Sequence, residues 1–240
     1  KSGWRSPVAL LVLMSIAMPV AFNTWNALLN NFVVERASFT GVEIGILQSL
    51  REVPGFIAFT TVFVLLLIRE QTFAVVSLAI LGIGVAATGF FPTVYGLYFT
   101  TVVMSLGFHY FEAVKQSLSL QWLSKDEAPQ VLGRLISVAS ITSLVVYGVL
   151  WVFLEVFQLD YLWNFLLAGV LCTGFAVVIW LGYPHFESKT PQHSHLVLRK
   201  RYWLYYALIF FSGARRQIFM VFAAFLMVEK FGYTAAQVTV

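Results

Sequence analysis

Charged residues are scarce in this chain. Asp, Glu, Lys and Arg together make up 11% of its 240 residues, whereas hydrophobic residues make up 60%. Soluble domains carry about 25% charged residues, so the composition excludes an ordinary soluble domain. The net charge of +4 does not indicate nucleic-acid binding, because Lys and Arg gather in the cytoplasmic loops of membrane proteins. The expected surrounding is the lipid bilayer.

Cysteine and nucleotide-binding motifs are also lacking. Cys172 is the single cysteine, which excludes an intrachain disulfide and a cysteine-based metal site. No Gly-x-x-x-x-Gly-Lys-Ser/Thr loop occurs, so we do not expect the chain itself to use ATP. We expect no cofactor, no metal site and no enzyme activity.

Long apolar runs are abundant instead. A helix that crosses a bilayer needs roughly 20 apolar residues, and short breaks with turn or charge signals separate runs of this length. The pattern predicts an all-α membrane protein, and a polar stretch at 184–201 predicts a linker. The seven predicted spans are 7–34, 42–68, 73–91, 94–122, 131–154, 160–182 and 202–228.

The basic residues predict the orientation of these spans. If the N-terminus is cytoplasmic, nine Lys and Arg residues fall on the cytoplasmic side, and only Arg36 and Lys230 fall outside. This asymmetry follows the positive-inside rule. It predicts a cytoplasmic N-terminus and a cytoplasmic linker.

A short repeat links the first and seventh spans. Residues 34–44 and 228–238 align without gaps at an offset of 194, with Val, Glu and Thr identical in the two segments. Six spans lie within one period, so both copies have the same orientation. Parallel repeats of this kind occur in transporters. We expect both segments to be turns at one end of the bundle, each leading into a new helix.

This layout resembles the major facilitator superfamily: a cytoplasmic N-terminus, six spans, a basic linker and a seventh span that restarts the pattern. The family's Gly-x-x-x-Asp-Arg-x-Gly-Arg-Arg loop is only weakly matched, because residues 68–72 read Ile-Arg-Glu-Gln-Thr. The resemblance implies a six-helix bundle over 1–182, a linker over 183–201, and the first helix of a second bundle over 202–240. It also implies that the remainder of a C-terminal half is missing.

The resemblance implies secondary active transport of a small solute by alternating access, as a symporter or antiporter in a bacterial inner membrane. A six- or seven-span membrane enzyme or receptor is the alternative. Five further apolar spans downstream would favour the transporter.

Polar residues inside the fourth span are candidates for binding or coupling. His109 and Glu112 share one helical face with Gln116, and a histidine beside a carboxylate is suited to taking up and releasing a proton. A simple ion pair between Glu112 and Lys115 is the alternative. The spacing His109-x-x-Glu112 is not that of a zinc protease.

The second and seventh spans carry buried cations. Arg51 stands beside Glu52 and near Pro54, which is expected to kink the helix. Arg51 is a candidate for substrate binding, with a structural ion pair as the alternative. Arg215 and Arg216 lie near the middle of the seventh span without an acid in that span. A guanidinium group recognises carboxylates and phosphates, so these two arginines favour an anionic solute.

The first span carries a polar stripe. Asn23, Asn26 and Asn30 recur at helical spacing, a pattern that favours either helix packing or the lining of a cavity. By resemblance, the first, fourth and seventh spans line the central cavity, which adds Asn23 and Asn26 to the candidate site.

Glycines indicate where helices pack closely. Gly41-x-x-x-Gly45 at the start of the second span, and Gly82 and Gly84 in the third, are predicted to be packing positions.

Overall fold

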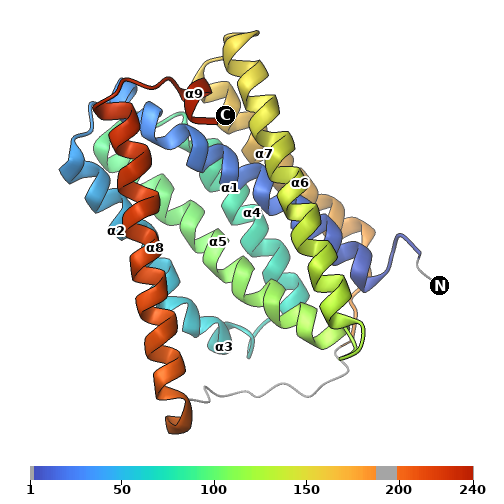
Figure 1. Ribbon diagram of the computed structural model, residues 1–240. Helices are drawn as coiled ribbons and strands as arrows, with labels where there is room; N and C mark the ends of the chain where they lie inside the picture. The colour runs from blue at the N-terminus through green and yellow to red at the C-terminus, as the bar shows by residue number, and fades with distance from the viewer. Residues whose placement is uncertain (1–2, 188–198, 240) are drawn as a thin grey trace.

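The structure is a computed structural model that describes residues 3–187 and 199–239, with side chains described outside 213–221, 224 and 239. Every regular element within these residues is helical (Figure 1), which confirms the predicted fold class. The elements in chain order are α1 (Pro7–Ala37), α2 (Gly41–Ile57), η1 (Ala58–Thr60), α3 (Thr61–Val64), α4 (Glu70–Thr88), α5 (Val94–Trp122), α6 (Ala128–Glu155), α7 (Tyr161–Gly182), η2 (Lys200–Tyr202), α8 (Trp203–Glu229) and α9 (Ala235–Thr239).

Four of the described helices are long and apolar enough to cross a membrane, namely α1, α4, α6 and α7. Helix α5 has 29 residues and so extends about 43 Å at 1.5 Å per residue, but it carries His109, Glu112 and Lys115. A helix satisfies its backbone hydrogen bonds within its own segment, which is what an apolar surrounding requires.

The second predicted span is not one continuous helix. Helix α2 passes through Pro54 and ends at Ile57, and the 3₁₀ turn η1 and the short α3 follow. The interruption therefore begins after Pro54 rather than at it. At the start of α2, a Cβ atom on Gly41 or Gly45 would meet nothing within 4 Å among the described residues. The close packing predicted there is not seen among the described residues.

Helix α4 packs closely against both α5 and α7. A Cβ atom on Gly84 would lie 2.5 Å from the backbone nitrogen of Met104, and one on Gly169 would lie 2.3 Å from the carbonyl oxygen of Gly82. Cβ atoms essentially never approach other heavy atoms below 3.0 Å, so only glycine permits these helix contacts. The packing role predicted for Gly82 and Gly84 is confirmed.

The two copies of the repeat end their helices in the same way. Ser38 and Gly232, which are equivalent at the offset of 194, both adopt the left-handed conformation, with φ of 52° and 67°. The N–H groups of Phe39 and Tyr233 then donate to the carbonyl six residues back, at 3.0 and 3.1 Å. Both helices therefore end in a turn that is closed around a left-handed residue, a common way to satisfy the last carbonyl groups of a helix.

The two copies also begin their next helix in the same way. The backbone N–H of Thr40 donates to Glu43 Oε2 at 2.8 Å, and that of Thr234 donates to Gln237 Oε1 at 2.9 Å. Both are the return bond of a capping box, in which Thr precedes Glu or Gln by three residues. The two turns lie at the same end of the bundle (Figure 1). The predicted pair of equivalent turns is confirmed.

Candidate functional site

A charged cluster lies between α2 and α5. Arg51 on α2 bonds Glu52 through two nitrogens, with Nη2 at 2.8 Å and Nε at 3.1 Å from Oε1. The Arg51 side chain is only 12% exposed, whereas that of Glu52 is 45% exposed. Ser105 on α5 donates from its hydroxyl to the carbonyl oxygen of Arg51. This bond fixes the two helices to each other at the level of the ion pair.

His109 completes the cluster one turn further along α5. Its imidazole lies against the backbone of Gly55, where a Cβ atom would come within 2.7 Å of the ring. The charged groups that interact electrostatically with this imidazole are Glu52 and Arg51. Ser105 and His109 are four residues apart, so both face α2. The structure therefore brings together two of the predicted residues, Arg51 and His109.

Glu52 was noted in the sequence beside Arg51 but was not included among the candidate site residues. The spacing on α5 had paired His109 with Glu112, but the acid that acts on His109 comes from α2. Its signal in the sequence was its position directly after Arg51 inside an apolar run. Glu112 forms an ion pair with Lys115 instead, at 3.8 Å, which is the alternative interpretation of that motif.

Two asparagines of α1 form hydrogen bonds with other segments of the chain. Asn23 Nδ2 donates to Ser143 Oγ on α6 at 2.7 Å. Asn31, which is fully buried, donates to the carbonyl oxygen of Tyr233 in the turn between α8 and α9 at 2.7 Å. Asn26 is half-buried between these two contacts. Of the polar stripe, Asn23 contacts another helix, which fits the packing alternative, and the part of the stripe in solute binding stays a prediction.

Arg215 and Arg216 lie on α8, but their side chains are outside the described residues. The anion-binding role predicted for them therefore stays a prediction. Helix α8 itself contacts α1.

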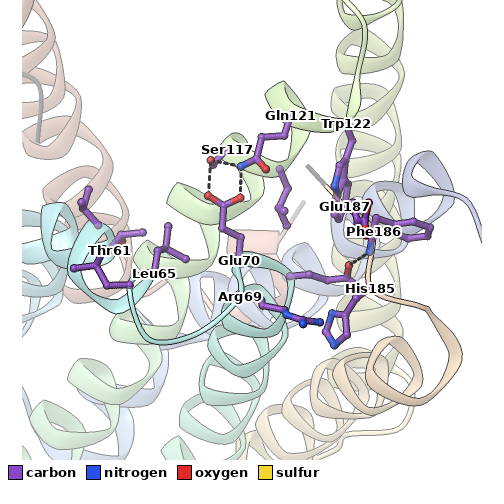
Figure 2. A pocket seen from close by; sticks show the side chains of 14 residues that line it. Thr61, Leu65, Arg69, Glu70, Ser117, Gln121, Trp122, His185, Phe186 and Glu187 are labelled. Atoms are coloured by element: carbon purple, nitrogen blue, oxygen red, sulfur yellow. Dashed lines mark hydrogen bonds between the residues drawn. The ribbon is translucent and has the colours of Figure 1, made fainter. Parts of the chain in front are cut away.

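A second polar site lies near the end of the bundle that is opposite the two equivalent turns. It is a pocket of about 680 Å³ formed by three segments (Figure 2). These are the stretch from α3 to the start of α4, the end of α5, and the residues that follow α7. The carboxylate of Glu70 accepts hydrogen bonds from Ser117 Oγ at 3.3 Å and from Gln121 Nε2.

Gln71 fixes the chain that leaves α7 to this pocket. Its Nε2 donates to the carbonyl oxygen of Pro184 at 2.9 Å, and its Oε1 accepts from the backbone N–H of Phe186 at 3.0 Å. The ring of Phe186 meets Trp122 at the end of α5, edge to face, with 5.5 Å between centroids. The sequence had indicated only a loop and the start of a linker here, because the partners are more than 100 residues apart.

Comparison with known proteins shows a fold and no family. No protein-family model matches the sequence, and no curated protein matches it. A solved structure described as an auto-inhibited POT family peptide transporter is similar, with 15% sequence identity and a TM-score of 0.56. The match covers 94% of this chain and 48% of that one, so this chain spans about half the length of that transporter. The apolar helices and this likeness define an all-helical membrane protein with a transporter-like fold.

Proposed function

We propose that this chain is the N-terminal half and the seventh helix of a secondary active transporter that moves a small solute by alternating access. The observation that supports this proposal most strongly is the burial of Arg51, whose side chain is 12% exposed within a bundle of transporter-like fold. A central cation costs about +2.5 to +3.5 kcal/mol on insertion scales, so buried charges of this kind mark solute or ion pathways. In this proposal, residues 1–182 form the first bundle, 183–201 the linker, and 202–240 the start of the second bundle.

The cluster of Arg51, Glu52 and His109 is suited to binding an anionic solute. Arg51 already binds one carboxylate oxygen of Glu52 through two hydrogen bonds, and its guanidinium group can also bind the carboxylate of a solute. In the empty state Glu52 neutralises Arg51. An arriving solute anion replaces Glu52, and Glu52 takes a proton from water as it leaves. The charge of the site is then unchanged, and no buried charge loses its partner.

His109 supports coupling to protons. Its imidazole lies beside this ion pair, and histidine exchanges protons near neutral pH. We propose that His109 passes the proton between water and Glu52. Arg215, Arg216, Glu112, Asn23 and Asn26 are proposed as further cavity residues of the complete protein.

Uptake by the complete protein in proteoliposomes tests this proposal. The solute panel should begin with small peptides, which the similar structure is described as transporting, and should include monocarboxylates and neutral sugars. We expect uptake of a carboxylate-bearing solute that an inward proton gradient accelerates. Uptake of neutral solutes alone, with no response to pH, would refute anion binding and coupling.

A matched pair of variants assigns the role of Arg51. Arg51→Gln should raise KM roughly 10- to 100-fold, because a hydrogen bond to a charged group is worth about 1.5–3 kcal/mol. Arg36→Gln is the control, because Arg36 also pairs with an acid, Asp160, but in an exposed position where half of each side chain is accessible. Equal KM values for the two variants would leave Arg51 with a structural role only.

A further inference from the structure

The charge of Glu70 is not balanced by any cation of the described residues. Glu70 is the first residue of α4, and its two carboxylate oxygens accept hydrogen bonds from Ser117 and Gln121, which are both neutral. Gln121 is 6% exposed. None of the ion pairs in the described part of the chain includes Glu70. Both donors are neutral, so no ion pair within the described residues competes with a cationic ligand for this carboxylate.

The walls around this carboxylate are largely apolar and aromatic. Trp122 and Phe186 form the aromatic side, and Leu65 and Leu118 are among the aliphatic residues that line the pocket. Trp122 is 8% exposed, so its ring is held in place. Aromatic faces attract cations, and the volume of about 680 Å³ is within the range of small-molecule sites.

The cationic side chains that line the pocket are directed away from the Glu70 carboxylate. Arg69 extends toward the ring of His185, away from the Glu70 carboxylate, which points to Ser117 and Gln121 (Figure 2). Both Arg69 and His185 are exposed to water, which screens their charges.

From these contacts we propose that the pocket binds an ammonium group attached to an apolar body. The ammonium group lies against the Glu70 carboxylate, and the apolar body lies against Trp122 and Phe186. A free amphipathic amine and the ammonium headgroup of a lipid share this chemistry. The site is separate from the Arg51 cluster, so it stands whether or not the proposed transport is found.

Three probes that share a phenyl ring and differ in charge test the proposal on the wild-type protein in a neutral detergent. They are 2-phenylethylamine, which is a cation at pH 7, 2-phenylethanol, which is neutral, and 3-phenylpropionate, which is an anion. Isothermal titration should give a Kd for the amine at least tenfold lower than for the alcohol, and no binding of the anion. Equal binding of amine and alcohol, or tighter binding of the anion, would overturn the proposal.

Two variants locate the binding. Glu70→Gln keeps the volume of the side chain and one of its two acceptor oxygens but removes its charge, and it should weaken amine binding at least tenfold. Glu155→Gln, an exposed position at the end of α6, is the matched control and should bind like wild type. If Glu70→Gln does not fold, Ser117→Ala replaces it as a test, because it loosens one bond to the carboxylate and keeps the charge. Ser117→Ala should retain amine selectivity, and a loss of selectivity there would count against Glu70 as the anchor.

Lipid composition separates the two sources of the ligand. Amine titrations in nanodiscs of phosphatidylethanolamine are compared with titrations in nanodiscs of phosphatidylglycerol. Binding only in phosphatidylglycerol means that an ammonium lipid already occupies the pocket, and equal binding in both means that the ligand is a free amine. Absence of amine binding in both nanodiscs and in detergent would reject the site.

Discussion

Gly107 tests how closely α4 and α5 must approach each other. A Cβ atom at this position would lie 2.2 Å from the backbone nitrogen of Leu81 and 2.6 Å from the carbonyl oxygen of Ser77. Ordinary contact begins at 3.4 Å, so Gly107→Ala requires a local helix separation of about 1.2 Å. Both obstructing atoms belong to the backbone of α4, and therefore no side-chain rotation can relieve the clash.

The expected cost follows from two opposing effects. Overpacking a close contact costs typically 1–3 kcal/mol, occasionally more. Alanine in a helix interior is favoured over glycine by about 0.8–1.0 kcal/mol. Because the clash is with backbone, we place the first effect at the upper end of its range, and Gly107→Ala should destabilise the protein by about 2 kcal/mol.

Unfolding by sodium dodecyl sulfate in mixed micelles, followed by circular dichroism, measures this difference. Gly148→Ala on α6 is the matched control, because its Cβ atom would meet nothing within 4 Å among the described residues. That variant should be as stable as wild type, or up to about 1 kcal/mol more stable. If Gly107→Ala unfolds at the same detergent fraction as Gly148→Ala, the close packing of α4 on α5 is refuted.

Further predictions concern the turn after α8 and the orientation of the chain. Asn31→Leu removes the hydrogen bond to the carbonyl oxygen of Tyr233, at a cost of about 1–3 kcal/mol for the buried group left unpaired. The variant should therefore show faster hydrogen exchange of the amides in that turn. Unchanged exchange would mean that Asn31 does not hold the turn. Gly232→Ala should cost about 1 kcal/mol because φ is +67°, and detergent unfolding measures it; wild-type stability would argue against the left-handed turn. In a Cys172-free variant, a cysteine placed in the linker at 183–201 should be labelled only from the cytoplasmic side, and labelling from outside intact cells would reverse the proposed orientation.

Features that depend on a few consecutive residues were readable from the sequence. The equivalence of the two turns followed from Thr40 and Glu43 matching Thr234 and Gln237 at one offset, and each pair forms its bond within three residues. Helix type was readable for the same reason, because apolar length and local capping determine it, although the break after Ile57 in the second span was not predicted. Such contacts do not depend on how the helices are arranged.

Contacts between helices were decided by the tertiary structure. Gly82 is enclosed by α7, whereas Gly41 meets nothing among the described residues, although both were predicted to pack. The difference is which face of each helix another helix covers. Likewise His109 has Glu52 beside it, and Glu112 pairs with Lys115. The spacing within α5 was known, but the register of α5 against α2 was not.

The pocket at Glu70 shows most clearly which features are local in the sequence and which depend on the tertiary structure. By itself the sequence determined that this chain is a set of apolar helices joined by short turns, because the length of an apolar run and the residues that flank it are local properties. Only the tertiary structure placed Glu70 against Gln121 and Gln71 against Pro184, since these partners are 51 and 113 residues apart. Spacing along one helix says nothing about which distant segment packs beside it, so a site built from three segments becomes visible only when the chain is folded.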